Sequence, residues 1–189
     1  MSDAASLAEY PKTIVLPDGA HLVLRPMAAA DRPALRALLA RLPDDERRRV
    51  PDPLAAVSSA SDPVPSDASG LLVVLAVDGE RVAAVAALER AANPGPRHLA
   101  EVALVLDPAC RGRRLGTWML LDCVHLAGGL GVERLVASVA EGEHEYLAAL
   151  HRLDFVEDAS ATGGRRAPDG DVRTTRIMAK TLHRGWTDF

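Results

Sequence analysis

The chain has 189 residues, of which 48% are hydrophobic and 25% charged, and it carries a formal net charge of −4. This length and composition favour one domain with a real core and leave little room for two. The acidic balance argues against a general nucleic-acid binder, because affinity for phosphates needs a positive surface.

The chain also lacks the signals of membrane insertion and export. No apolar run reaches the roughly 18 residues that a membrane helix needs. The start of the chain, Met1 to Glu9, has neither the basic nor the apolar stretch of a signal peptide. We therefore expect a cytoplasmic protein with no membrane partner and no nucleic-acid partner. Cys110 and Cys123 have no CxxC spacing, and free thiols are favoured over a single disulfide.

The first predicted element is a hairpin. Two short β-type runs within residues 13–25 flank Pro17-Asp18-Gly19, which suits a reverse turn because proline presets φ and glycine accepts a positive φ. A helix follows, with Asp31 as its N-cap and Pro33 in its first turn, and Pro43 ends it. The apolar stripe of this helix consists of Leu35, Leu38, Leu39 and Leu42.

From Pro43 to Gly70 the composition changes to prolines, serines and acidic residues without an apolar period. We expect a loop here, with one short helix near residues 54–58. A connection of this length is uncommon in a compact domain and indicates either a mobile lid or a disordered insert.

The middle of the chain predicts three strands and a helix. Residues 70–77 and 81–88 flank an Asp-Gly turn and form a hairpin, and residues 99–106 form a central, largely apolar strand. A helix then runs from about Leu115 to Ala127 and is expected to end at Gly128-Gly129.

The last part adds a strand at 135–138, a helix at 145–153, a strand from Phe155 and a final strand at 173–181. The strand–loop–helix–strand unit needs a right-handed crossover and a parallel pair. We predict an α+β fold with a single mixed, mostly antiparallel sheet, flanking helices and a central parallel strand–helix–strand unit. The expected division is an N-terminal tail over 1–12, one domain over 13–182 and a C-terminal tail over 183–189.

The segment most informative about chemistry is the basic loop between the central strand and the helix at Leu115. Unpaired N–H groups at a helix start, together with the positive end of its dipole, form an anion site. Gly112 and Gly116 permit close approach of the backbone to a ligand, and three arginines add charge. The pattern matches neither the P-loop nor the dinucleotide-binding glycine motif. The residues alone predict a phosphate or diphosphate cradle.

Residues 107–117 resemble the acetyl-CoA signature of the GNAT N-acetyltransferase superfamily, in which Arg or Gln, two residues, Gly, one residue and Gly or Ala follow the fourth strand. The resemblance covers most of the chain and includes Leu153-Asp-Phe155, where the family usually has Leu-Gly-Phe. In detail the chain is similar to bacterial stand-alone members and to the acetyltransferase domains of protein-lysine acetylating enzymes. The resemblance implies the GNAT fold, acetyl-CoA as the acyl donor, no metal, and transfer to an amine of a small molecule or to a protein lysine or N-terminus.

The resemblance also assigns the cofactor contacts. Backbone N–H groups between Arg111 and Thr117 would hold the diphosphate, and Leu104 and Leu106 would pair with the pantetheine amides where the central strand diverges from its neighbour. The divergence would leave a donor for the thioester carbonyl. The implied cofactor-binding residues are Leu104, Leu106, Arg111, Gly112, Arg113, Arg114, Gly116 and Thr117.

Glu101 is the candidate catalytic base, because similar enzymes place a glutamate at the start of this strand and an amine must lose a proton before it attacks. Strand alternation puts Glu101, Ala103 and Val105 on one face. A solvent-facing glutamate at a strand end remains the alternative. His98 is a second, weaker candidate.

The sequence departs from the family pattern at four places. Arg114 stands where a second loop glycine is usual, and an arginine forced to positive φ costs about 1–2 kcal/mol. Asp154 replaces a glycine, Glu143 stands where many relatives have an asparagine, and Leu150 stands where a tyrosine often protonates the thiolate. Tyr146 or a water would then supply that proton. These departures keep open a catalytically weak acyl-CoA-binding sensor or a partner-binding module on the same fold.

The acceptor is not identified by the sequence. Acceptor specificity in the superfamily lies in regions that correspond to residues 44–69 and 159–171, and Arg165 and Arg166 in the second region hint at an acidic acceptor. The cluster of acids and one histidine at 141–145 lacks metal-ligand spacing, so we expect no metal site. Antiparallel edge strands permit a homodimer.

Overall fold

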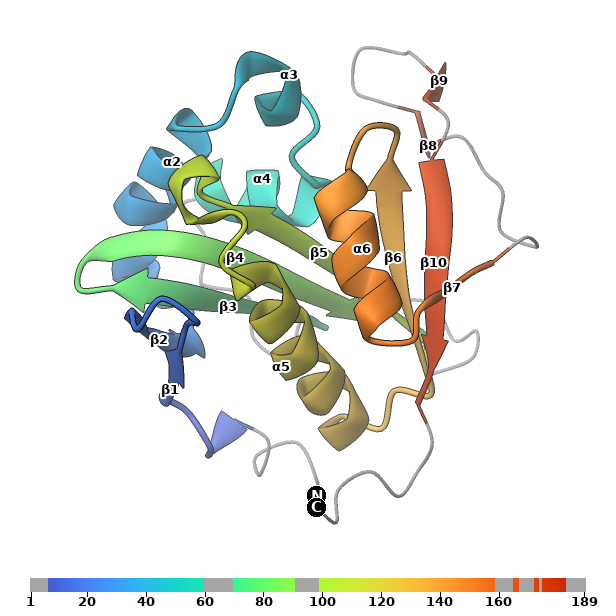
Figure 1. The fold of residues 1–189 in the computed structure, drawn as a ribbon, viewed down its shortest axis with the longest axis horizontal. Helices are drawn as coiled ribbons and strands as arrows, with labels where there is room; N and C mark the ends of the chain where they lie inside the picture. The colour runs from blue at the N-terminus through green and yellow to red at the C-terminus, as the bar shows by residue number, and fades with distance from the viewer. Residues whose placement is uncertain are drawn as a thin grey trace.

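The computed structural model describes residues 7–59, 70–90, 99–158, 165–166, 172–173 and 175–182. Among the described residues of the N-terminal half, the hairpins β1–β2 and β3–β4 flank the helices α2, α3 and α4 (Figure 1). Its elements are β1 (Lys12–Val15), β2 (His21–Pro26), a 3-10 turn (Ala29–Asp31), α2 (Arg32–Ala40), α3 (Asp44–Arg47), α4 (Asp52–Ser59), β3 (Leu71–Asp78) and β4 (Arg81–Arg90).

The second half begins with the central strand and its crossover helix. Its elements are β5 (Leu99–Leu106), a 3-10 turn (Pro108–Cys110), α5 (Leu115–Gly129), β6 (Arg134–Ala140), α6 (His144–Arg152), β7 (Val156–Glu157), β8 (Arg165–Arg166), β9 (Val172–Arg173) and β10 (Thr175–Thr181).

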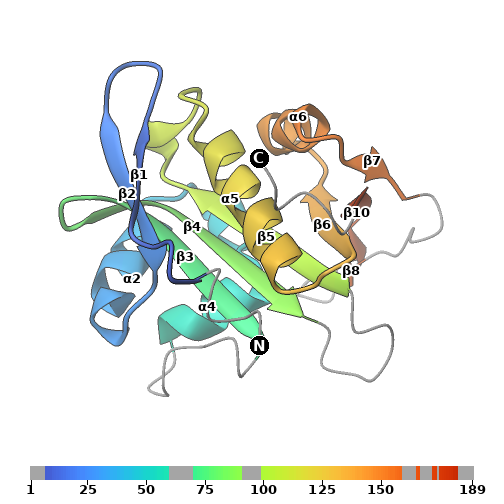
Figure 2. The same ribbon diagram turned by 90° about the horizontal axis from the view of Figure 1, so that it is seen from below.

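Eight strands form one sheet in the order β1-β2-β3-β4-β5-β6-β10-β7, and β8 and β9 form a separate pair. Within the large sheet β5 and β6 are parallel, whereas the other neighbouring pairs are antiparallel. The helices α5 and α6 cover one face of the sheet, and α2 and α4 cover the other (Figure 2). The predicted α+β class with a mixed sheet and a parallel strand–helix–strand unit is confirmed.

The parallel pair β5 and β6 separates after three residue pairs. The register ends at Glu101 opposite Val136. Beyond this point β5 continues to pair with β4 as far as Leu106, and β6 continues to pair with β10 as far as Ala140. The two central strands therefore diverge, and each keeps one backbone edge turned toward the gap between them.

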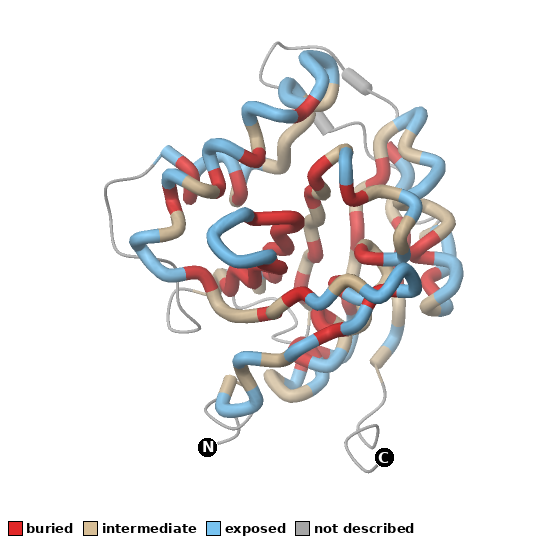
Figure 3. Tube along the Cα trace, turned by 60° about the vertical axis from the view of Figure 1, so that its left-hand side comes forward, coloured by how far each residue is buried: buried red, intermediate tan, exposed pale blue. Residues whose placement is uncertain are grey.

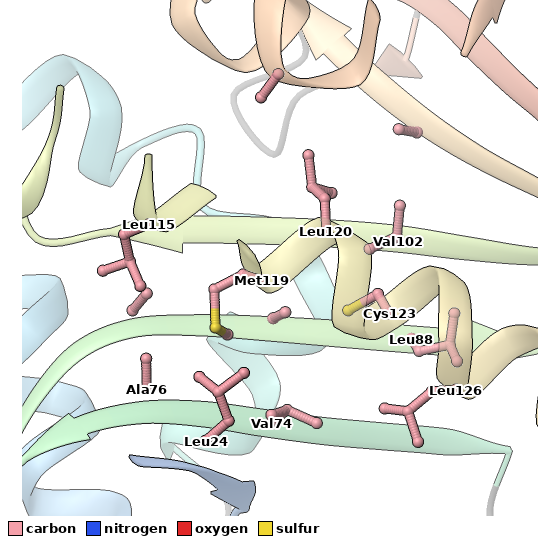
Figure 4. Packing of buried hydrophobic residues seen from close by; sticks show 14 of the residues in the cluster. Leu24, Val74, Ala76, Leu88, Val102, Leu115, Met119, Leu120, Cys123 and Leu126 are labelled. Atoms are coloured by element: carbon pink, nitrogen blue, oxygen red, sulfur yellow. The ribbon is translucent and has the colours of Figure 1, made fainter. Parts of the chain in front are cut away.

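The core has two parts, one on each face of the sheet, and the red segments of Figure 3 trace them through the middle of the molecule. The face beneath α5 is packed by aliphatic side chains from the helix and from β2 to β5 (Figure 4). Alternation along β5 divides its residues: Val102 packs with the α5 side, whereas Ala103 and Val105 pack with the α2 side. Glu101, which its spacing places on one face with Ala103 and Val105, therefore belongs to the α2 face.

Two helix boundaries differ from the sequence prediction. Gly128 and Gly129 lie inside the last turn of α5, and the chain changes direction only at Gly131, whose φ is +73°. Asp31 is the residue before α2, but its side chain does not cap that helix. Its carboxylate instead accepts the N–H of Ala28 at 2.7 Å and pairs with Arg25 at 2.6 Å.

The segment predicted as a loop with one short helix contains two helices in its described part. The expected helix at 54–58 is α4, and α3 is an additional four-residue helix. The second half of this segment, residues 60–69, lies outside the described residues, as does His98. Leu7 and Tyr10 pack against the core, so contacts with the domain begin before residue 13.

Candidate active site

A cleft of about 960 Å³ opens where β5 and β6 diverge. Its walls come from β5, the loop before α5, the start of α6 and the segment that joins α3 to α4. The predicted site residues that lie in these walls are Glu101, Leu104, Leu106, Arg111, Gly112, Arg114, Gly116 and Thr117. A cleft of this volume falls in the range of small-molecule and cofactor sites.

Arg113 is the predicted cofactor residue whose side chain the structure places elsewhere. Its Nε donates a hydrogen bond to the carboxylate of Asp18, in the turn between β1 and β2. The sequence suggested a shared role for three arginines, but Arg111 and Arg114 line the cleft whereas the Arg113 side chain is held by Asp18.

The N-terminus of α5 forms one end of the cleft. The first helical hydrogen bond runs from the N–H of Trp118 to the carbonyl of Arg114 at 3.2 Å. The N–H groups of Leu115, Gly116 and Thr117 therefore have no acceptor within the helix, and the side chain of Arg114 does not cap them. These donors and the positive end of the helix dipole make this end of the cleft attractive to anions.

The loop before α5 uses left-handed backbone conformations at two positions. Gly112 has φ of +70° and Arg114 has φ of +64°. Glycine adopts this region freely, whereas arginine is strained there by about 1–2 kcal/mol. The conformational cost that the sequence anticipated at Arg114 is therefore present in the fold.

Gly116 has a packing role as well as a place in the cleft wall. A Cβ atom on Gly116 would lie 3.5 Å from Leu104 and 3.6 Å from Leu106, which is ordinary van der Waals contact. The Cα–H of Gly116 thus faces the leucines of β5, and these leucine side chains support the start of α5. It is the backbone edge of β5 that faces the gap between the strands.

Arg111 links the loop before α5 to the helix α3. Its Nη1 donates to Oε1 of Glu46 at 2.8 Å, and its Nη2 donates to the second carboxylate oxygen, so the pair is bidentate. Glu46 belongs to α3, and both residues line the cleft. On the same side, Arg49 donates to the carbonyl of Glu141 at 3.5 Å. These contacts hold the α3 segment against the loop before α5 and the turn after β6.

Asp107, the last residue before the loop, fixes where the loop starts. Its buried carboxylate pairs with Arg41 at 2.7 Å and with Arg81 at 2.6 Å, and it accepts the N–H of Ala109 at 3.0 Å. Burial opposes its ionisation, but the hydrogen bonds from Arg81, Ala109 and Arg41 outweigh burial and hold the pKa of Asp107 below its usual range.

Glu101 lies at the point where β5 and β6 separate. The Oγ of Ser138, on β6, donates a hydrogen bond to Oε1 of Glu101 at 2.8 Å. Both residues line the cleft. The sequence offered no partner for Ser138, because the contact joins residues 37 positions apart and depends on the register of two parallel strands.

Tyr146 of α6 reaches the diverging edge of β5. Its hydroxyl donates to the carbonyl of Val102 at 3.3 Å, and burial raises the pKa of this phenol. Leu150, where the family often has a tyrosine, is fully buried in the core and cannot take part in chemistry. Tyr146 is therefore a hydroxyl that the fold brings to the part of the cleft where the strands separate.

Glu143 closes the turn after β6. Its Oε2 accepts the N–H of Ala140 at 2.7 Å. Burial raises the pKa of Glu143, and the bond from Ala140 only partly offsets that effect. Asp154, the second departure from glycine, has φ of +60°, a conformation that aspartate tolerates better than most residues.

The described residues hold no group of three or more histidine, cysteine, aspartate or glutamate side chains that could bind a metal ion. Within the same residues, none of the helices combines the length and the apolar character needed to cross a bilayer.

Comparisons with known proteins agree with this geometry. The model of the acetyltransferase (GNAT) family matches residues 35–155. The fold is similar to the GNAT domain of PAT from S. lividans, with a TM-score of 0.72 and 19% identity, covering 93% of this chain and 98% of that one.

Two further similar structures were solved with the acetyl donor. One is yncA from Salmonella typhimurium with its cofactor acetyl-CoA, with a TM-score of 0.61 and 17% identity over 86% of this chain and 94% of that one. The other is a phosphinothricin acetyltransferase from Sinorhizobium meliloti in complex with acetyl-CoA, with a TM-score of 0.59 and 24% identity over 87% and 90%. No curated protein matches the chain in sequence. Because the family model spans well over half of the sequence, the chain belongs to the acetyltransferase (GNAT) family.

Proposed function

We propose that the protein is an N-acetyltransferase that moves the acetyl group of acetyl-CoA to an amine, either of a small molecule or of a protein lysine or N-terminus. The observation that carries the proposal is that one cleft is lined by three features: the anion-attracting start of α5, the open edge of β5 and the carboxylate of Glu101. Each of these three features matches one part of the reactants.

The diphosphate of acetyl-CoA would bind the backbone N–H groups between Arg111 and Thr117. The cofactor-binding residues proposed are Leu104, Leu106, Arg111, Gly112, Arg113, Arg114, Gly116 and Thr117. Arg113 would contribute through its backbone, since its side chain pairs with Asp18. Leu104 and Leu106 would contribute backbone groups that pair with the pantetheine amides like an added strand.

The thioester would then lie between the separating strands, near Glu101. In the reaction an ammonium acceptor loses one proton to Glu101, and its nitrogen forms a C–N bond to the acetyl carbon as the C–S bond breaks. The second proton on nitrogen goes to the thiolate, so the products are an amide, coenzyme A thiol and one released proton. Tyr146, whose hydroxyl lies at the diverging edge of β5, would relay this proton: it gives its own proton to the thiolate and takes the second proton from nitrogen, so it ends the step neutral.

The test is thiol release from acetyl-CoA with a panel of amines and peptides. We expect Glu101→Gln to lower kcat by roughly a hundredfold or more while the Kd for acetyl-CoA changes little, since general-base catalysis contributes about 10²–10⁴-fold. Glu80→Gln, in the exposed turn between β3 and β4, is the matched control and should behave as wild type. Equal turnover in wild type and Glu101→Gln would remove Glu101 from the base role.

A second candidate function is acyl-CoA binding without efficient turnover, as in a sensor or a partner-binding module. Two observations favour it: Leu150 is buried where a catalytic tyrosine is frequent, and Arg114 occupies a strained position in the loop. This candidate predicts saturable coenzyme A binding and no amide product with any acceptor. Acetylation at ordinary enzymatic rates would eliminate it.

A further inference from the structure

Glu101 borders two spaces, the main cleft and a much smaller void. On the α2 face of the sheet, Glu89 of β4 lies directly opposite Glu101 in the antiparallel register. Side chains of such pairs share a face, with Cβ atoms about 4.5–5.5 Å apart. On the side of Glu89 and α4 lies a small void of about 10 Å³, lined by Glu89, Glu101, Pro51, Pro53, Ala87 and Ala103. Glu101 thus separates the main cleft from this void.

One contact draws Glu101 away from the void. Ser138 projects from β6, and its Oγ donates to Oε1 of Glu101 at 2.8 Å. The parallel pairing of β5 and β6 ends at Glu101 and Val136, two residues before Ser138. The hydroxyl therefore bridges the two strands just past the point where their backbones part, inside the wall of the cleft.

From this geometry we infer that Ser138 is a positioning residue that aims the base Glu101 into the cleft. The inference rests on the proposed function, because it gives Ser138 a role only if Glu101 accepts a proton from the acceptor amine. Repulsion from Glu89 disfavours the orientation toward the void, and the hydrogen bond from Ser138 stabilises the orientation toward the cleft. Without the hydroxyl, the carboxylate would lose this bond and sample a wider range of orientations.

The test compares Ser138→Thr with Ser138→Val. The two variants have nearly the same volume, but a methyl group in Val takes the place of the hydroxyl in Thr. Both are β-branched and suit a strand. We expect Ser138→Val to lower kcat roughly tenfold or more, since small misplacements of a catalytic group have effects of this size. We expect Ser138→Thr to stay within about threefold of wild type, and the Kd for acetyl-CoA to be unchanged in both.

A second readout separates positioning from a general structural effect. In a Glu101→Gln background no base remains to be aimed, so Ser138→Val and Ser138→Thr should show the same kcat. If either β-branched variant lowers the melting temperature, Ser138→Ala replaces Ser138→Val in this comparison. Its effect on kcat must then also disappear in the Glu101→Gln background.

Equal kcat in the Val and Thr variants, or a Val effect that persists in the Glu101→Gln background, would overturn the role of Ser138 and leave the proposed function intact. Absence of turnover in the wild-type protein with every amine would instead defeat the proposed function, and the role of Ser138 with it. The wild-type assay thus tells the two failures apart.

Discussion

Replacing Gly112 with alanine tests the diphosphate site without disturbing its packing. Gly112 has φ of +70°, and a Cβ atom there would meet no heavy atom within 4 Å. The variant therefore bears only the conformational cost of alanine in the left-handed region, about 1–2 kcal/mol. Alanine also lowers the conformational entropy of the unfolded chain, which stabilises the folded state by about 0.4–1 kcal/mol. We expect the free energy of unfolding to fall by roughly 1 kcal/mol.

The chain offers a matched control in Gly131, after the far end of α5. Its φ is +73°, a Cβ atom there would also meet no heavy atom within 4 Å, and it is not part of the cleft wall. Gly131→Ala should therefore lose about the same stability as Gly112→Ala in urea unfolding.

The two variants should differ in ligand binding. The new methyl group at residue 112 enters the space assigned to the diphosphate, so calorimetry should show acetyl-CoA bound at least tenfold more weakly, about 1.4 kcal/mol. Gly131→Ala should bind as wild type. Wild-type affinity in Gly112→Ala, or an equal loss in both variants, would refute the assignment of this loop to the diphosphate.

Three further predictions concern charged groups around the cleft. Because the pKa of Glu143 is raised, its carboxyl binds a proton more tightly in the folded state, and wild type loses stability as the pH rises from about 4. Glu143→Gln should thus melt higher than wild type at pH 7 but not at pH 4, and equal melting at pH 7 would contradict this. The pKa of Asp107 is lowered, so its contribution is present above about pH 4 and lost as the pH falls further. Asp107→Asn should lower the free energy of unfolding by about 1–2 kcal/mol at pH 7. A difference from wild type that stays constant down to low pH would be inconsistent with the pairing of Asp107 with arginines. Glu46→Gln removes the competitor for Arg111, so acetyl-CoA should bind several-fold more tightly than to wild type or to Asp45→Asn, and weaker binding would argue against a role for Arg111 in holding phosphate.

Elements with a strong local pattern were predictable from the sequence. The alternation along β5 put Glu101 on one face with Ala103 and Val105, and the glycines and basic residues before α5 predicted an anion site in a loop that lines the cleft. The helix α3 was missed because its four residues are all charged and carry no apolar period. Glu46 of this helix pairs with Arg111, 65 positions along the chain, and such a contact leaves no local signal.

The finer geometry of the site depends on tertiary contacts. The bond between Ser138 and Glu101 follows from where two parallel strands separate, which no residue spacing reveals. The direction of the Arg113 side chain depends on the position of Asp18 in a distant hairpin. The end of α5 depends on Gly131, although the sequence also offers Gly128 and Gly129 as earlier stops.

A crystal structure of the protein with acetyl-CoA would test the central claim most directly. We predict diphosphate oxygens about 3 Å from backbone N–H groups between Arg111 and Thr117, with the thioester between the separating strands and beside Glu101. Acetyl-CoA bound at another surface, or a cleft left empty at saturating acetyl-CoA, would contradict the assignment of this cleft to acetyl transfer.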